Sequence, residues 1–373
     1  MSDNYRDVII VGAGPAGLSL SFYLQRYKIQ HLLLEKSRPF SQWYDRFDHF
    51  QTNTSNWMNQ LPGAPETGVD GDHLQENPNK LASKNQILAY LQQYFLAIKP
   101  PIQKPCEVTG FNYSSGQSWQ INSSLGQFQC RHLVVCTGSA AKPYRPELAR
   151  TLPQHVPTLH ANYYRNPQQI QTRRILLVGS GSSGVQICED LARSAQFDEI
   201  ILSVSGNLRF PWKVLGIPIH TIVNNLGLFD LDVESRLARW ILGQHTNRGD
   251  PATPPSPKVL IRDYGVKCVQ KIKYYDSDNL VTVTQEKIST QDLTVIWCTG
   301  YKPDYSPFPE SIMAVIRRQP RWPTASYGKL PGFKTLHFLG QRFQSTLASH
   351  SLYGISQDAK RIADRIQTDL LNP

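Results

Sequence analysis

The sequence has no apolar run long enough to cross a membrane as a helix, which needs about 20 consecutive apolar residues. Its polar beginning also lacks the apolar core of a signal peptide, so we expect a cytoplasmic protein without a membrane span. The six cysteines contain no Cys-x-x-Cys pair. They predict reduced core residues, and neither a disulfide framework nor a dithiol redox centre.

The ten histidines lack the spacing of a metal site, and no other cluster of metal ligands is evident. No metal is therefore expected. His31, His49 and His73 are interpreted as polar surface residues.

Charged residues are sparse, at 18% of the chain, and Lys and Arg exceed Asp and Glu by 39 to 29, which gives a net charge of +10. The positive charges are scattered, without the Lys/Arg-rich run that is typical of nucleic-acid binding. We therefore expect no nucleic-acid partner, while the positive excess suits nucleotide phosphates. The 373 residues exceed what one core usually supports, which predicts two domains, or one domain inserted into another.

One pattern occurs twice along the chain. Residues 8–17 are an apolar run followed by GAGPAG, after which a helix-like stretch extends to about residue 27 and a second apolar run covers residues 31–35. Residues 174–184 are likewise an apolar run followed by GSGSSG, with an amphipathic stretch and a further apolar run at 200–204. Each copy predicts a strand, a glycine turn, a helix and a second strand, which begin a dinucleotide-binding domain.

A second repeat closes each copy. Residues 133–138 and 295–300 are both apolar runs that stop at Thr-Gly. We therefore predict an α/β fold of two Rossmann-like dinucleotide-binding domains, one inserted into the other. The predicted outer domain comprises residues 1–145 and 301–373, and the predicted inserted domain comprises residues 146–300.

The segments around these repeats are less regular. Residues 85–98 predict a helix, and residues 106–130 predict the short strands of a meander. Residues 207–258 combine clustered prolines with a helix-like stretch at 231–242. They predict a surface excursion or a lid, to which the sequence assigns no role.

The first glycine motif has the context that a nucleotide site requires. Gly12 permits the tight turn, Gly14 lets the backbone approach a pyrophosphate, and Gly17 allows close packing of the helix. Pro15 stands at a first-turn position, where its missing N–H costs nothing. Glu35, at the end of the next strand, can accept hydrogen bonds from ribose hydroxyls.

The second motif differs at the position equivalent to Glu35. The strand after its helix ends in Ser203-Val204-Ser205 without a carboxylate, and Arg209 follows. Serines and an arginine favour a 2′-phosphate, whereas a carboxylate would repel it, so the inserted domain is predicted to prefer NADPH to NADH. The alternative is that Arg209 is only a solvated surface charge.

Taken together, the two glycine motifs, the two Thr-Gly strands and the apolar residues 336–340 resemble the two-dinucleotide-binding-domain flavoproteins. Within them the chain resembles the flavin-containing monooxygenases, which include plant YUCCA-type enzymes and bacterial flavoproteins linked by name to potassium transport. Residues 160–165, HANYYR, resemble the second half of the fingerprint F-x-G-x-x-x-H-x-x-x-F/W, whereas Gln154 and Val156 stand where its Phe and Gly belong.

The resemblance implies FAD in the outer domain, NADPH in the inserted domain, and O2 and a small organic substrate as further partners. It implies insertion of one oxygen atom, through a C4a-peroxyflavin, at a nitrogen, sulfur, carbonyl or 2-oxo acid. The incomplete fingerprint keeps open an FAD-containing NADPH dehydrogenase or reductase that passes electrons to a quinone, a protein or a small acceptor. A nucleotide-sensing protein that binds FAD or NADP without turnover is a further alternative, against which the complete glycine motifs argue. A homodimer is also left open.

The resemblance also suggests site residues. Residues 52–58, TNTSNWM, are similar to a family segment whose asparagine faces the flavin, which makes Asn53 the candidate catalytic residue, with a plain loop asparagine as the alternative. Trp43, Phe47, Phe50 and Trp57 are candidate walls of a dry pocket, or simply core residues. The predicted cofactor contacts are Gly12, Gly14, Pro15, Ala16, Gly17, Glu35, Lys36, Trp43, Val108, Thr137, Gly138, Gly179, Gly181, Ser182, Ser183, Gly184, Ser203, Ser205, Arg209, Gly340 and Leu352.

Overall fold

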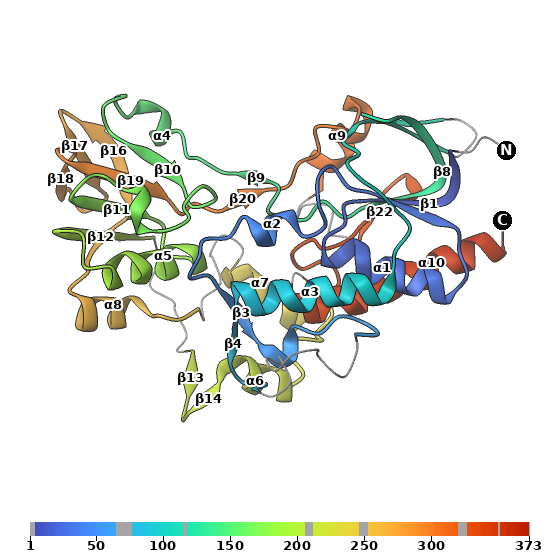
Figure 1. Cartoon of the computed structure of the whole chain (residues 1–373), viewed down its shortest axis with the longest axis horizontal. Coiled ribbons are helices and arrows are strands. Elements are labelled where there is room, and N and C mark those ends of the chain that lie inside the picture. Colours follow the sequence, from blue (N-terminus) through green and yellow to red (C-terminus); the bar gives the residue numbers. More distant parts are fainter. Residues whose placement is uncertain are drawn as a thin grey trace.

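The computed structural model describes residues 4–64, 77–114, 118–205, 212–245, 253–319, 327–349 and 351–372. Within these residues the chain forms two separate large β-sheets, each built around parallel strands, which lie on opposite sides of the molecule in Figure 1. Each sheet has helices on a face, as expected for parallel strands that are buried on both sides.

The first sheet combines strands from the beginning and the end of the chain. Its strands follow the order β21-β22-β8-β1-β2-β5, and β6 and β7 continue from β8 as the antiparallel meander that the sequence predicts. Their bounds are β1 (Tyr5–Val11), β2 (His31–Leu34), β5 (Ile102–Gln103), β6 (Val108–Tyr113), β7 (Trp119–Ser123), β8 (Gly126–Val135), β21 (Lys329–Leu330) and β22 (Phe333–Phe338).

Different elements cover the two faces of this sheet. Apolar side chains of α1 (Pro15–Arg26), α3 (Lys84–Ile98) and α10 (Leu352–Leu371) form one buried cluster with β1. On the other face, β6, β7 and α9 (Glu310–Arg317) pack against β8 and β22. The ends of the central strands β1 and β8, at residues 8–11 and 133–135, are buried on both sides, which explains why both are continuous aliphatic runs.

The second sheet comes from the middle of the chain and is parallel throughout. Its order is β10-β19-β11-β12-β15, with β10 (Thr158–His160), β19 (Leu293–Trp297), β11 (Arg174–Val178), β12 (Glu199–Val204) and β15 (Lys267–Gln270). One face carries α5 (Ser182–Arg193) and α8 (Pro257–Tyr264). The other carries an antiparallel sheet of β16 (Ile272–Asp276), β17 (Asn279–Thr282) and β18 (Lys287–Ser289).

The chain leaves the first sheet after β8 and returns to it at β21, so the second sheet is an insertion, as predicted. The two crossings pair with each other: β9 (Lys142–Pro143) runs antiparallel to β20 (Tyr301–Lys302), and both lie between the sheets in Figure 1. The domain boundaries at residues 145 and 300 stay a prediction.

The predicted excursion packs against the first unit. Its described elements are β13 (Lys213–Val214), β14 (Ile217–Pro218), α6 (Ile219–Asn225) and α7 (Arg236–His245). Asp232 forms an isolated bridge with Thr346, and the N–H of Val233 donates to the carbonyl of Ser345. The excursion is therefore attached to the segment that precedes α10.

Several short elements complete the described structure: α2 (Ser41–Tyr44), β3 (Gln51–Ser55), β4 (Leu81–Ser83), α4 (Leu148–Thr151) and the 3-10 turns η1 (Asn56–Met58) and η2 (Pro167–Gln169). A search of the described residues finds no helix long and apolar enough to span a membrane. Among the same residues no group of three or more His, Cys, Asp or Glu side chains could hold a metal ion.

Candidate active site

A cavity of about 540 Å³ lies where the ends of β1, β2 and β8 meet the beginnings of α1, α5 and α10. It brings together residues from both glycine motifs. The predicted site residues that line it are Gly12, Gly14, Pro15, Ala16, Glu35, Lys36, Trp43, Asn53, Val108, Thr137, Gly138, Ser182, Ser183, Gly340 and Leu352.

The first glycine turn is held by close backbone contacts. Gly12 has a φ of +107°, and a Cβ there would lie 2.7 Å from the carbonyl oxygen of Cys136. A Cβ on Gly17 would lie 2.1 Å from the carbonyl oxygen of Gly12. Gly14, by contrast, has no atom within 4 Å of its Cβ position and lines the cavity. The turn thus leaves open space where α1 begins, and the N-terminal end of a helix favours an anion.

Glu35 fixes the geometry of this turn. Its carboxylate is buried, and Oε2 accepts a hydrogen bond from the backbone N–H of Ala13 at 2.8 Å. Oε1 accepts one from the backbone N–H of Ser37 at 3.1 Å. The hydroxyl of Ser37 also donates to Oε1, at 3.4 Å. Because an ionised carboxylate has about four acceptor positions, Glu35 keeps capacity for a further hydroxyl donor on its cavity side.

The second glycine turn repeats this geometry. Gly179 has a φ of +108°, and its Cβ would lie 2.5 Å from the carbonyl oxygen of Cys298. A Cβ on Gly184 would lie 2.0 Å from the carbonyl oxygen of Gly179. Gly181 is the N-cap of α5, whose first residues, Ser182 and Ser183, line the same cavity as the first turn.

Of the three residues predicted to bind a 2′-phosphate, Ser203 is buried, Ser205 is exposed, and Arg209 is not described by the structure. Ser203 is buried and does not line the cavity: its hydroxyl donates to the carbonyl of Gln270 and accepts from the N–H of Ile272, each at 3.3 Å. Ser205 is exposed just after β12. Arg209 lies outside the described residues. The end of β12 carries no carboxylate, as the sequence analysis noted.

Two buried polar atoms of the cavity wall have no hydrogen-bond partner among the residues that the structure describes. They are Nε of Arg46 and Oγ1 of Thr137. The Arg46 guanidinium lies 5.5 Å from the ring centre of Phe50 and 5.9 Å from that of Tyr301. A buried polar atom without a partner costs about 1–3 kcal/mol, so these positions favour a polar, anionic ligand such as a dinucleotide. The sequence analysis did not identify Arg46.

Asn53 lies on β3 and faces the cavity. Its Oδ1 accepts a hydrogen bond of 3.3 Å from Nε2 of Gln186, which belongs to α5 and also lines the cavity. Sequence reasoning missed Gln186, although a polar residue between Val185 and Ile187 on a buried helix was an available signal.

The proposed aromatic wall is only partly present. Trp43 and Phe50 line the cavity. Phe47 is buried against Tyr164, and Trp57 packs edge-on against Tyr353, so neither reaches the cavity wall. Phe47 belongs to the core packing that the sequence analysis left open as the alternative, whereas Trp57 is half-buried and belongs to neither the cavity wall nor a core cluster.

The cysteines of the described structure are all free. Cys106 and Cys136 line the cavity, but both are buried, and burial raises the pKa of the Cys136 thiol well above its usual range. Burial likewise raises the pKa of Cys298 to about 12. A thiol in this state is protonated at neutral pH and is a poor nucleophile.

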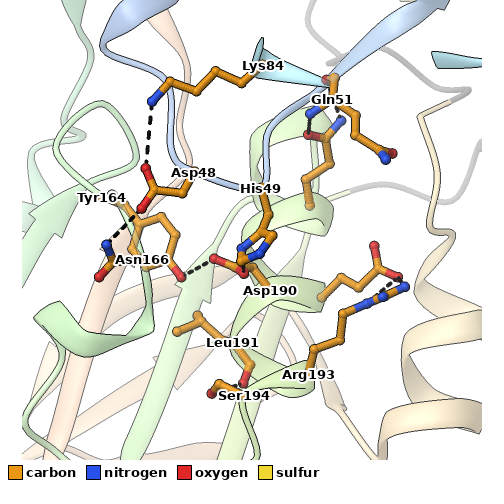
Figure 2. Close-up of polar contacts among 12 residues, drawn as sticks. Asp48, His49, Gln51, Lys84, Tyr164, Asn166, Asp190, Leu191, Arg193 and Ser194 are labelled. Atoms are coloured by element: carbon orange, nitrogen blue, oxygen red, sulfur yellow. Dashed lines mark hydrogen bonds and ion pairs between the residues drawn. The ribbon is translucent and has the colours of Figure 1, made fainter. Parts of the chain in front are cut away.

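A polar cluster next to the cavity joins the two units (Figure 2). His49 Nδ1 lies 2.6 Å from one oxygen of the buried Asp190, and the hydroxyl of Tyr164 donates to the other oxygen at 2.6 Å. Asn166 donates to Asp48 at 2.9 Å. His49 and Asp48 precede β3, whereas their partners lie in the inserted unit, so these contacts hold β3 against α5.

The interpretation of His31 as a surface residue is wrong. Its ring is buried between Ser21 Oγ, at 2.8 Å, and the carbonyl of Ile29, at 2.9 Å, and burial lowers its pKa. A small polar partner on α1 allows an imidazole to occupy the core there. The His49 side chain is 74% exposed, as expected, although it also binds Asp190. His73 lies outside the described residues.

The family model and the relatives of similar sequence are all described as oxidoreductases or monooxygenases. The family model described as "Pyridine nucleotide-disulphide oxidoreductase" matches residues 9–204, more than half of the chain. An uncharacterized CzcO-like oxidoreductase of Geobacillus kaustophilus is 29% identical over 98% of both chains. A probable indole-3-pyruvate monooxygenase of Arabidopsis thaliana, YUCCA9, is 26% identical over 79% of this chain and 74% of its own.

Solved structures show the same fold. A flavin-containing monooxygenase from Stenotrophomonas maltophilia aligns with a TM-score of 0.74 at 20% identity, covering 98% of this chain and 99% of its own. A bacillithiol disulfide reductase from Bacillus cereus aligns with a TM-score of 0.69 at 18% identity, covering 98% and 99%.

Proposed function

The chain belongs to the pyridine nucleotide-disulphide oxidoreductase family, and we propose that it is an FAD-dependent, NADPH-consuming monooxygenase. In this proposal it inserts one oxygen atom from O2 into a small organic substrate. The observation that carries the proposal is the single cavity that receives the beginnings of both α1 and α5. A nucleotide on each glycine turn would reach into the same space.

The residues of the first unit fit FAD. The open backbone at Gly14 and the helix end at Pro15 would hold the pyrophosphate, and Glu35 would accept the ribose hydroxyls. Thr137, with its unpartnered hydroxyl, and Gly138 lie further along the same wall. When bound, FAD would supply the hydride acceptor and the site of reaction with O2.

The residues of the inserted unit fit NADPH. Ser182 and Ser183 would hold its pyrophosphate at the beginning of α5, where the helix dipole favours negative charge. The absence of a carboxylate at the end of β12 supports a preference for NADPH over NADH. The proposed outer domain of residues 1–145 and 301–373 would thus bind FAD, and residues 146–300 would bind NADPH.

The surroundings of the cavity support oxygenation over thiol chemistry. The family model includes disulphide oxidoreductases, but burial keeps the cavity thiol of Cys136 protonated. Asn53 offers an amide, which can donate a hydrogen bond without being acidic. Trp43 and Phe50 would limit the access of water. Relatives that are named monooxygenases, such as the Arabidopsis protein, support the same choice.

The test measures where the electrons of NADPH go. The purified, FAD-loaded protein is supplied with NADPH or NADH, and O2 consumption and H2O2 release are recorded with and without a probe substrate. Suitable probes are indole-3-pyruvate, cyclohexanone and S-allyl-L-cysteine, which are named for proteins of similar sequence or fold. We expect NADPH to be preferred, and one probe to lower the H2O2 released per NADPH consumed. If every probe leaves H2O2 unchanged while a quinone accepts the electrons, the protein is a reductase.

A further inference from the structure

The side-chain amide of Gln186 makes three hydrogen bonds. Its Oε1 accepts from the backbone N–H of Gln51 at 3.2 Å, and its Nε2 donates to the carbonyl of Gln51 at 3.1 Å and to Oδ1 of Asn53 at 3.3 Å. The side chain is buried, with 8% of the residue exposed. The amide thus accepts one hydrogen bond from the backbone of Gln51 and donates one to it, as the backbone of a neighbouring strand would do.

This pairing removes the ambiguity in the orientation of both amides. A backbone N–H can only donate and a carbonyl can only accept, so Gln51 dictates which end of the Gln186 amide is the oxygen. One N–H of Nε2 donates to the carbonyl of Gln51, and its second N–H faces Asn53. Asn53 must therefore accept that hydrogen bond through Oδ1. The Nδ2 group of Asn53, which makes no hydrogen bond to the part of the protein that the structure describes, is left for the cavity.

We propose that Gln186 is a positioning residue that fixes Asn53 as a hydrogen-bond donor toward the cavity. The inference rests on the proposed function, in which Asn53 contacts the reacting groups. Gln186 also follows Ser182 and Ser183 by one turn of α5, so the same helix would hold a nucleotide and set the orientation of Asn53. The inserted unit thereby contributes to a catalytic group that the first unit carries.

Gln186→Glu is the sharpest test because it preserves shape and removes both donors. The carboxylate would face the carbonyl of Gln51 and Oδ1 of Asn53, and Asn53 would turn its Nδ2 toward it. Asn166→Ala is the matched control, since it removes a contact between the same two units, to Asp48, without touching Asn53. If Gln186→Glu does not fold, Gln186→Met, which has no donor and no charge, serves in its place.

The first readout is the rate of H2O2 release after the NADPH-reduced protein is mixed with O2 in the absence of substrate. Loss of one buried hydrogen bond corresponds to roughly a tenfold change, so we expect Gln186→Glu and Asn53→Ala each to accelerate release about tenfold. Their combination should accelerate it no further than Asn53→Ala alone. Reduction by NADPH should change much less than H2O2 release. An effect no larger than that of Asn166→Ala, or one that persists in the Asn53→Ala background, overturns the proposal.

The second readout is independent of the proposed function. The thermal unfolding midpoint of the purified full-length protein, as it is isolated, is measured for Gln186→Met, Asn53→Ala and both together. Residues in direct contact give non-additive effects, so the double variant should lose less than the two single losses combined. If the wild-type protein proves to have no NADPH-dependent reaction with O2, the proposed function fails while non-additivity still supports the contact. Additive losses overturn the positioning of Asn53 whatever the activity.

Discussion

The two glycine turns provide matched substitutions that separate the two nucleotide sites. In Gly17→Ala the new Cβ would lie 2.1 Å from the carbonyl oxygen of Gly12, and in Gly184→Ala it would lie 2.0 Å from that of Gly179. Ordinary contact begins near 3.4 Å, so α1 must move by about 1.3 Å or α5 by about 1.4 Å. The backbone N–H groups at the beginning of the helix would then lie too far from a bound phosphate. Loss of two charge-assisted hydrogen bonds, at about 1.5–3 kcal/mol each, weakens binding by roughly 10²- to 10⁴-fold.

We therefore expect Gly17→Ala to be purified without yellow colour, and Gly184→Ala to stay yellow but to need at least about a hundredfold more NADPH for anaerobic reduction. The measurements are the flavin absorbance after gel filtration and the NADPH dependence of the reduction rate. Gly110→Ala, whose nearest neighbour would lie at an ordinary 3.4 Å, is the control and should behave as wild type. The reasoning is refuted if Gly184→Ala loses FAD, or if Gly17→Ala retains it with unchanged affinity.

Three further predictions concern stability and Arg46, whose buried Nε has no hydrogen-bond partner among the described residues. Burial lowers the pKa of His132 to about 4 from 6.5, and the buried His337 stacks against it. As the pH falls, His132 therefore binds a proton in the unfolded chain before it does so in the folded protein. The free energy of unfolding should be at its full value above about pH 6.5 and fall by up to about 3 kcal/mol as the pH approaches 4. A free energy of urea unfolding that is unchanged between these pH values contradicts this. Tyr164→Phe, which leaves Asp190 with one partner fewer, should lower the free energy of unfolding by about 1–3 kcal/mol, and a loss within error of zero contradicts it. Arg46→Met should weaken retention of FAD about tenfold in dialysis, and an unchanged affinity would assign Arg46 to another ligand.

The sequence predicts the fold well because its strongest signals are local. An aliphatic strand, a glycine turn and a helix follow one another in consecutive residues. Both strand–turn–helix units form as predicted, with their turns at Gly12 and Gly179. The repeated Thr-Gly strands likewise predict that one sheet interrupts the other. These features depend on backbone geometry, which few residue types other than glycine satisfy.

The parts of the site that sequence reasoning did not reach depend on contacts between distant segments. Gln186 meets Asn53 where hydrogen bonds to Gln51 and the polar cluster around Asp190 join β3 to α5. Ser203 stands at the expected end of its strand, but its side chain faces the neighbouring strand β15, which no local pattern reveals. Arg46 shows no periodicity that distinguishes a cavity residue from a surface one.

In the proposed reaction, electrons from NADPH and one atom of O2 reach a substrate in this cavity. To test this, the NADPH-reduced protein is mixed with isotopically labelled O2 in the presence of the probe that best suppresses H2O2 release, and the label is followed by mass spectrometry. We expect one labelled oxygen atom in each product molecule and one NADPH consumed per product. If the label is found only in H2O2 and the probe is recovered unchanged, the protein is not a monooxygenase for that probe.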